Sequence, residues 1–130
     1  MSIANDKSAV IRFEDLVVWQ KARVLSNDIY RVTRQSAFSL DRDLVRQIRR
    51  CVISVMANIA EGSERRTTPE YDYFLNIAKG SSAELRSHLY IAFDQGYLAR
   101  EEFEALMDKS NEIGRMLRGL MNSEKRKPRP

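Results

Sequence analysis

The sequence predicts an all-α protein, specifically an up-down-up-down bundle of four helices that make one domain. Four separate segments repeat apolar residues at alternating steps of three and four, which is the spacing of one helix face. No segment sustains the apolar-polar alternation that is typical of a strand. The segments are similar in length and their connections are short, and short connections place successive helices antiparallel. A length of 130 residues leaves room for a single domain.

The first helix is expected to begin near Glu14 and Asp15 and to end near Gln35. Carboxylates favour this start because they stabilise the positive end of the helix macrodipole. Phe13 and Trp19 are expected to anchor the helix, since large aromatic side chains contribute much of a small core. Its apolar face consists of Val18, Ala22, Leu25, Ile29 and Val32.

The second helix follows a connection, residues 36–39, that is predicted to be polar. Gly62 is expected to end this helix, because glycine readily adopts the left-handed conformation that closes many helices. Its apolar face consists of Val45, Ile48, Val52, Val55 and Ile59.

The third and fourth helices have clear start and stop signals. Thr67 and Glu70 predict a capping box at the start of the third helix, and Gly96 predicts its end. The fourth helix is expected to begin near Arg100 and to end at Ser123, ahead of two prolines. The two apolar faces consist of Leu75, Ala78, Ser82, Leu85, Leu89 and Ala92, and of Phe103, Leu106, Ser110, Ile113, Leu117 and Leu120.

Charge is unevenly distributed along the chain. Residues 12–66 carry a net charge of +4, residues 67–123 carry −3 and residues 124–130 carry +3. A basic face and an acidic face on one chain are complementary between copies, so we expect a homo-oligomer, and such a head-to-tail contact can close into a ring. The predicted organisation is an N-terminal extension over 1–12, the bundle over 13–122 and a basic flexible tail over 123–130.

Composition excludes several classes of protein. No uncharged apolar run approaches the length of a membrane span, and a single cysteine excludes an internal disulfide or a cysteine-rich zinc site. The first residues lack the basic and apolar regions of a signal peptide, so a cytoplasmic protein is expected.

Catalytic and metal-binding patterns are lacking. His88 is the sole histidine and follows Glu84 by four residues, whereas a di-metal site in a bundle needs two Glu-x-x-His pairs. Cys51 has no base near it in sequence that would activate it as a nucleophile. We therefore expect a non-enzymatic protein without a cofactor or metal.

One polar cluster lies at the end of the second helix. Asn58 is expected to be a buried polar group that fixes helix register. The charge of Glu61 in the last turn opposes the macrodipole, so Arg65, Arg66 or a neighbouring subunit should compensate for it. Such local misfit marks a candidate interface or site.

A second cluster, the arginine strip, covers an exposed face of the second helix within about 100° of arc. It consists of Arg42, Arg46, Arg49 and Arg50. Asp43 is the one acid beside it in sequence, so the strip is expected to bind either phosphate or the acidic fourth helix of another subunit. A basic tail adds Lys125, Arg126, Lys127 and Arg129. Two functions stay open. The first is association with RNA or DNA through the arginine strip, the basic tail, Arg65 and Arg66. The second is an oligomeric protein-binding scaffold that contacts no nucleic acid.

Several motifs in order resemble the 23S rRNA-intervening-sequence protein family, the S23-type four-helix bundles. They are FEDLVVWQ (13–20), QIRR (47–50), NIAEG (58–62), AKGSSAEL (78–85), GYL (96–98) and EIGRML (112–117). These motifs contain Phe13, Trp19, Asn58, Glu61, Gly62, Gly80, Glu84, Gly96 and Tyr97. Met56 replaces a proline that is common in the family, which implies a straighter second helix. Ala99 replaces a common serine cap, which implies a frayed start of the fourth helix.

The resemblance implies a bundle that assembles into a ring, typically a pentamer, and an origin in bacterial genes linked to insertions in ribosomal RNA genes. A similar bundle is the accessory protein of diversity-generating retroelements, which implies nucleic acid and a reverse transcriptase as partners. The resemblance supplies no catalytic residues, and the family's biochemical function is unknown.

Overall fold

The computed structural model describes residues 12–126, with side chains as far as residue 121, and all of its secondary structure is helical in that part of the chain. The elements are the 3-10 helix η2 (Phe13–Asp15) and the α-helices α1 (Val17–Thr33), α2 (Ser36–Leu40), α3 (Arg42–Ser63), α4 (Thr68–Asp94) and α5 (Arg100–Arg126). The all-α prediction is therefore confirmed. None of the helices within the described residues is long and apolar enough to cross a membrane.

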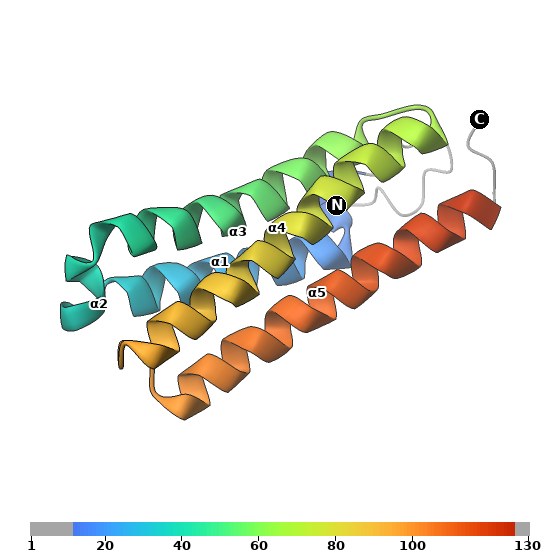
Figure 1. The fold of residues 1–130 in the computed structure, drawn as a ribbon. Coiled ribbons are helices and arrows are strands. Elements are labelled where there is room, and N and C mark those ends of the chain that lie inside the picture. Colours follow the sequence, from blue (N-terminus) through green and yellow to red (C-terminus); the bar gives the residue numbers. More distant parts are fainter. Residues whose placement is uncertain (1–11, 127–130) are drawn as a thin grey trace.

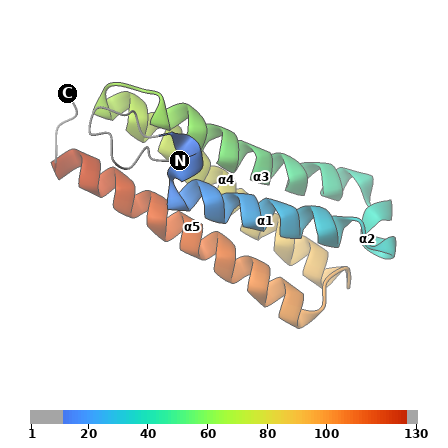
Figure 2. The same cartoon turned by 180° about the vertical axis from the view of Figure 1, so that it is seen from behind.

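The four long helices form an antiparallel bundle. Helix α3 packs against α1 and α4, and α5 packs against α4 and α1, so each helix has two neighbours and one diagonal partner. Figure 1 shows the start of α1 and the end of α5 at one end of the bundle, with α2 and the α4–α5 connection at the other end. Figure 2 shows the same order from behind, where α1 lies between α3 and α5. This is the up-down-up-down arrangement that short connections predict.

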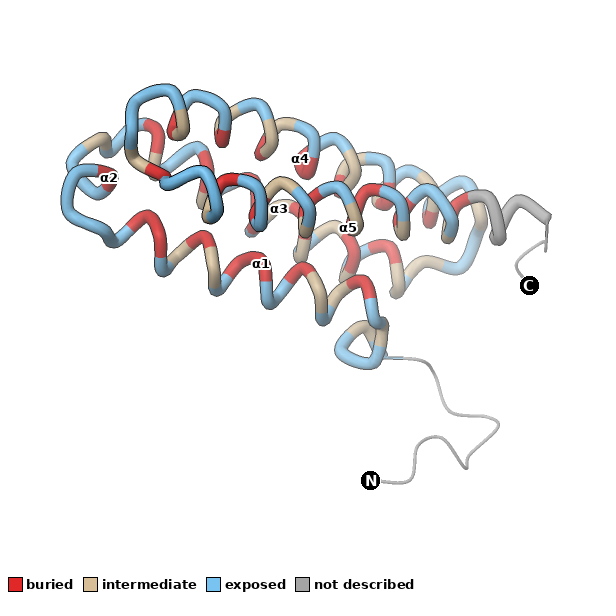
Figure 3. Tube along the Cα trace, turned by 90° about the horizontal axis from the view of Figure 1, so that it is seen from below, coloured by how far each residue is buried: buried red, intermediate tan, exposed pale blue. Residues whose placement is uncertain are grey.

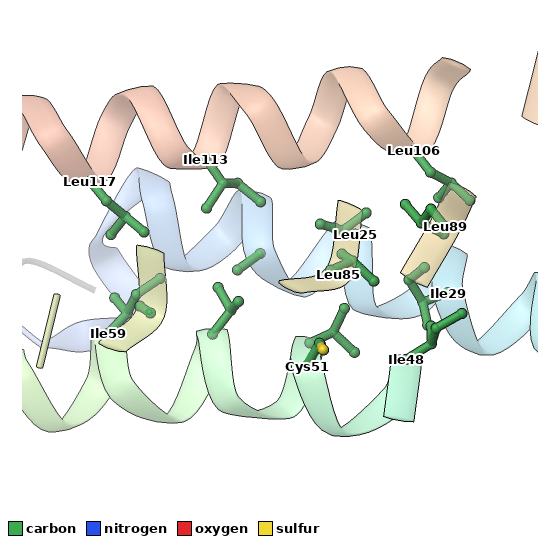
Figure 4. Close-up of a cluster of buried hydrophobic side chains, with 14 of the residues drawn as sticks. Leu25, Ile29, Ile48, Cys51, Ile59, Leu85, Leu89, Leu106, Ile113 and Leu117 are labelled. Carbon is green, nitrogen blue, oxygen red and sulfur yellow. The ribbon is translucent and has the colours of Figure 1, made fainter. Parts of the chain in front are cut away.

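The predicted apolar faces meet inside this bundle. Buried positions recur along the inner side of each long helix (Figure 3), and leucine and isoleucine side chains from all four helices pack together (Figure 4). Each fully buried side chain of this size contributes about 1.5–3 kcal/mol relative to an exposed one. Val45 and Leu120 differ from the prediction, because they are half-buried at the edge of the core, and Leu44 is buried near the start of α3 instead.

The connection over residues 36–39 is not a polar loop. It lies within α2, where Phe38 is 1% exposed and stacks on Tyr97 with ring centroids 5.1 Å apart. The Tyr97 hydroxyl donates to Asp41 Oδ2 at 3.0 Å, and Asp41 Oδ1 accepts from the Leu44 backbone N–H at 3.3 Å. The α4–α5 connection is thereby attached to the N-terminal cap of α3, which closes this end of the bundle.

Two glycines predicted to end helices have different roles. Gly96 lies just after α4 with φ +80°, the left-handed conformation that was expected. Gly62 lies inside α3, is buried and does not have a positive φ, since Gly96 is the one glycine with a positive φ within residues 12–126. A Cβ at position 62 would lie 3.3 Å from Cβ of Phe74, so this glycine permits close packing of α3 on α4. The conformational prediction for Gly62 was wrong.

The remaining helix ends agree closely with the prediction. Thr67 Oγ1 accepts from the Glu70 backbone N–H at 3.3 Å, which is the predicted N-cap of α4. Helix α1 begins at Val17, a few residues late, because the acidic pair before it forms η2. Helix α5 begins at Arg100 as expected and extends to Arg126, because good helix formers follow Ser123 and proline comes only at residue 128. Residues 1–11 and 127–130 lie outside the described part.

Trp19 packs against the edge of the core near the start of the first helix. Its ring meets Phe13 edge-on with centroids 5.1 Å apart, and Trp19 is half-buried against the core. Trp19 thus packs against the core and Phe13 packs against Trp19, but the indole is not fully buried.

Candidate phosphate-binding groove

The arginine strip lies along α3 as predicted, but its charges are partly neutralised. Arg46 Nη1 lies 3.1 Å from Asp43 Oδ1, a pair that is highly exposed and therefore contributes little. Arg50 forms an ion pair with Glu84 of α4 and also bonds to Gln47. Asp43 is the one acid beside the strip in sequence, which predicted that the chain's own acids could not neutralise the strip. That prediction was wrong for Arg50, because its acid comes from the neighbouring helix.

Arg49 is a structural residue of the α1–α3 contact. Its Nε donates to Thr33 Oγ1 at 3.0 Å, and its guanidinium lies 4.4 Å from the ring centroid of Tyr30. Such a cation–π contact stabilises by about 0.5–1 kcal/mol at an exposed site. Within residues 12–121, Arg42 is the member of the strip that has neither an acid nor an aromatic partner.

A shallow groove runs beside the strip. Its volume is about 450 Å³. Its lining consists of Ser39, Arg42, Val45, Arg46, Arg49, Arg50 and Ile53. Ile53 is 54% exposed, so the guanidinium groups border a partly apolar floor. An apolar floor with charged borders suits a protein surface better than a phosphate chain.

The cluster at the end of α3 is organised as predicted for Glu61. Arg65 forms an ion pair with Glu61, and its guanidinium lies 4.7 Å from the ring centroid of Phe74. Asn58 is half-buried and donates to the Ser54 backbone oxygen at 2.9 Å and to Ser54 Oγ at 3.1 Å. Asn58 therefore bonds within its own helix rather than across the bundle.

Asn58 acts across the bundle through its neighbour. Ser54 Oγ lies 2.7 Å from Ser81 Oγ of α4, so Asn58 is connected to α4 through Ser54, and its role in helix register stays a prediction. Arg66 is exposed in the connection between α3 and α4. Of the basic tail, Lys125 and Arg126 lie in the last turn of α5 and beyond the described side chains. Lys127 and Arg129 lie outside the described residues.

A second groove, between α4 and α5, collects cations that the sequence analysis did not identify. Figure 1 shows these two helices side by side. The groove has a volume of about 460 Å³. Its lining consists of Asn76, Lys79, Gly80, Ala83, Arg86, Asn111, Gly114, Arg115 and Arg118. Four residues of this lining are cationic, two are amides, the rest are small, and none is acidic.

The second feature of this groove is that its four cations lack a paired carboxylate among the described side chains. Among the residues whose side chains are described, none of Lys79, Arg86, Arg115 and Arg118 forms an ion pair. This distinguishes the α4/α5 groove from the arginine strip, in which Arg46 and Arg50 each have a carboxylate. Uncompensated positive charges close together attract an anion from solution.

Arg86 is held in place at the base of the groove. Its Nη1 donates to Ser82 Oγ at 3.2 Å, to Ser110 Oγ at 3.0 Å and to the Ser110 backbone oxygen at 3.3 Å. Burial lowers the pKa of the Arg86 guanidinium below its usual value. A cation that is half-buried and paired with neutral oxygens gains from an added anion, because the anion offsets its lost hydration.

Small residues keep the groove open. A Cβ at Gly80 would meet no atom within 4 Å, and one at Gly114 would lie 3.8 Å from Arg86 Nη1. Gly80 belongs to a motif shared with the resembled family, and in this structure Gly80 and Lys79 of that motif both line the groove. A ligand can therefore approach the cations without displacing large side chains.

A signal for this groove exists in the sequence. Lys79 and Arg86 are seven residues apart, as are Asn111 and Arg118, and residues seven apart lie on one face of a helix. The net negative charge of residues 67–123 concealed the pattern, because none of the acids of that segment lines the groove.

A third cluster joins groups that were judged separately in the sequence. Cys51 of α3, Glu84 and His88 of α4 place their ligating atoms within 4.8 Å of one another. Burial, and secondarily the charge of Glu84, raises the pKa of the Cys51 thiol to about 11. Burial acts to raise the pKa of Glu84, but hydrogen bonds from Arg50 and His88 outweigh it and leave that pKa lowered.

Comparisons with known proteins agree with this architecture. The family model of the 23S rRNA-intervening sequence proteins matches residues 14–119. One similar solved structure is a protein of unknown function from the S23 ribosomal protein family of Bacteroides thetaiotaomicron VPI-5482. It has 25% sequence identity and a TM-score of 0.73, and the match covers 81% of this chain and 98% of that chain. No curated protein matches this chain. The chain belongs to the 23S rRNA-intervening sequence protein family.

Proposed function

We propose that this protein binds the phosphate backbone of RNA or DNA in the α4/α5 groove, as a non-enzymatic nucleic-acid-associated protein. The observation that carries the proposal is the group of four cations that line one groove without a carboxylate partner among the described side chains. Each phosphate neutralised by such a group releases counterions, which is the main source of sequence-independent affinity.

Three of the four cations are arginines, and a planar guanidinium matches a phosphate through two parallel hydrogen bonds. Arg86 is already fixed by Ser82 and Ser110, so little conformational entropy is lost when it binds. The amides of Asn76 and Asn111 line the same groove and add hydrogen-bond donors without negative charge. The groove therefore favours a polyanion over a neutral ligand.

Assembly would strengthen this interaction. The resemblance to a family of ring-forming bundles leads us to propose a homo-oligomer, specifically the pentamer that the resemblance implies. Such a ring repeats the α4/α5 groove on every subunit. Weak contacts repeated on one scaffold combine by multivalency when one nucleic acid spans several subunits. Light scattering measures the mass, and a monomer at micromolar concentration and moderate salt would contradict the assembly.

A binding assay tests the groove directly. Fluorescence anisotropy with a structured RNA and with duplex DNA should show binding that is tolerant of sequence. The double variant Arg115→Gln/Arg118→Gln should bind at least tenfold more weakly at low salt. The double variant Arg42→Gln/Arg46→Gln removes the same charge from the arginine strip and is the matched control. Equal weakening in both variants would show that net charge alone governs binding, and unchanged affinity in the groove variant would refute the proposal.

A second candidate function is a protein-binding scaffold that uses the groove beside the arginine strip. The partly apolar floor formed by Val45 and Ile53 favours a protein partner, either another copy of the chain or a separate protein such as the reverse transcriptase that the resemblance implies. Replacing Ile53 with glutamate should then leave the bundle folded. It should reduce the oligomeric mass if the partner is another copy of the chain, or abolish binding of the separate protein. If the wild-type chain does not bind nucleic acid even at low salt, this result would favour the scaffold function over the first.

A further inference from the structure

We propose that Cys51, Glu84 and His88 form a binding site for a divalent transition-metal ion of the zinc class. Their ligating atoms lie within 4.8 Å of one another at the contact between α3 and α4. Glu84 and His88 are four residues apart on α4 and so lie on one face of that helix, opposite Cys51 of α3. This inference does not depend on the proposed function.

The donor set selects the kind of metal. A thiolate, an imidazole and a carboxylate are the ligands that Zn²⁺ accepts, whereas Mg²⁺ and Ca²⁺ prefer sets made of oxygen alone. Three protein ligands leave the fourth tetrahedral position to water or to a substrate atom. The side chains of Glu84 and His88 are 39% and 21% exposed, so this position opens to solvent while Cys51 lies in the core. Figure 4 shows Cys51 on the side of α3 that faces the other helices.

The distances between the three ligating atoms are close to those of a tetrahedral zinc site. Bonds of 2.0–2.3 Å place the ligands of a tetrahedral zinc site roughly 3.3–3.8 Å apart. Glu84 Oε2 and His88 Nε2 already lie 3.3 Å apart. The sulfur therefore needs to approach by at most about 1.5 Å, which a change of the cysteine or carboxylate rotamer can supply.

The present hydrogen bonds can be exchanged for metal ligation. Glu84 accepts from Arg50, and Arg50 also donates to Gln47 Oε1 at 2.8 Å, so the guanidinium retains a partner when the carboxylate turns to a metal. The Nδ1 atom of His88 is buried without a hydrogen-bond partner among the described residues. Within that part of the chain Glu84 is the one hydrogen-bond partner of the imidazole, so metal ligation by the ring exchanges a single hydrogen bond.

Metal binding at this site must release a proton. The neutral Cys51 thiol forms a bond to the metal through its sulfur, and the sulfur–hydrogen bond breaks with the proton going to the solvent. The bound ion then has a thiolate and a carboxylate that together balance its two positive charges. Apparent affinity should therefore rise with pH by about tenfold per unit while the thiol is protonated and the imidazole is neutral.

Cobalt is a suitable probe because the chain contains one cysteine and one histidine. Titration of the full-length, metal-free protein with Co²⁺ should produce the sulfur-to-cobalt charge-transfer band and the visible bands of tetrahedral Co²⁺, at one equivalent per chain. Added Zn²⁺ should abolish both sets of bands. The absence of a sulfur band in the folded wild-type protein at excess Co²⁺ would overturn the proposal.

Variants assign the ligands. Cys51→Ser should remove the charge-transfer band, and His88→Gln and Glu84→Gln should each weaken Co²⁺ binding at least tenfold. Glu112→Gln is the matched control, because Glu112 has similar exposure and an ion pair with Lys21. Circular dichroism identifies any variant that fails to fold, in which case Cys51→Ala or His88→Ala replaces it. Retention of wild-type binding in folded His88 or Glu84 variants would also refute the three-ligand site.

Discussion

The hydroxyl oxygens of Ser82 and Ser110 lie 2.7 Å apart, and both residues are 0% exposed in the contact between α4 and α5. Each hydroxyl also bonds to the backbone oxygen of the opposite serine at 3.0 Å. Arg86 donates to both hydroxyl groups, so this polar pair in the core supports the cation at the base of the α4/α5 groove. The stability of the bundle and the geometry of the proposed phosphate site therefore depend on the same two residues.

Replacing Ser110 with alanine should destabilise the protein by about 1–3 kcal/mol, because buried hydrogen-bonding groups lose their partner. Urea unfolding followed by circular dichroism measures the change. Ser87→Ala, an exposed serine on α4, is the matched control and should change stability by less than about 0.5 kcal/mol. Equal effects of the two variants would contradict the role assigned to the serine pair.

Two glycines should respond to alanine with opposite signs. Gly80→Ala should stabilise the protein by about 0.5–1 kcal/mol, because the added methyl group meets no atom within 4 Å and alanine favours a helix. Gly62→Ala should destabilise it, because the new Cβ would lie 3.3 Å from Cβ of Phe74. Thermal unfolding of both variants measures the signs, and stabilisation by Gly62→Ala would show that α3 and α4 are not closely packed there.

The sequence was sufficient to predict the helices and most of the core, because these depend on local apolar spacing. It was insufficient for features that require two helices. No pattern near Arg50 in sequence predicts its ion pair with Glu84, and none near Cys51 predicts that His88 lies close to it. The capping box at Thr67 was predictable because both of its members are local, whereas the packing role of Gly62 depends on Phe74 across the bundle.

The hydrogen bond between Tyr97 and Asp41 can be tested by removing the tyrosine hydroxyl group. Tyr97→Phe keeps the stacking on Phe38 and deletes the hydrogen bond to Asp41, so the urea midpoint should fall. That hydrogen bond, with a smaller effect of burial, raises the pKa of Tyr97. Because the folded-state pKa is the higher one, its contribution is complete below the ordinary tyrosine pKa and is lost as pH rises through the folded value. The wild-type and Tyr97→Phe midpoints should therefore converge at strongly alkaline pH, and a constant difference would contradict this linkage.

The thiol of Cys51 should ionise at an alkaline pH of about 11, because burial and the nearby Glu84 carboxylate disfavour the thiolate. The thiol therefore stabilises the fold fully below its unfolded pKa, and the contribution is lost as pH rises through about 11. The difference in thiolate absorbance between the wild type and Cys51→Ser measures this value. An apparent pKa at or below the ordinary value for cysteine would show that solvent reaches the sulfur.

The salt dependence of nucleic-acid binding tests the central claim most directly. The logarithm of the association constant with duplex DNA should fall linearly with the logarithm of salt concentration, with a slope of about −0.9 for each phosphate contact. Arg115→Gln/Arg118→Gln should reduce the magnitude of that slope by about 2 per groove occupied, since each lost phosphate contact removes about 1. Arg42→Gln/Arg46→Gln should leave the slope within about 0.5 of the wild-type value if the strip makes no phosphate contact. A groove variant whose line has the wild-type slope would contradict phosphate binding between α4 and α5.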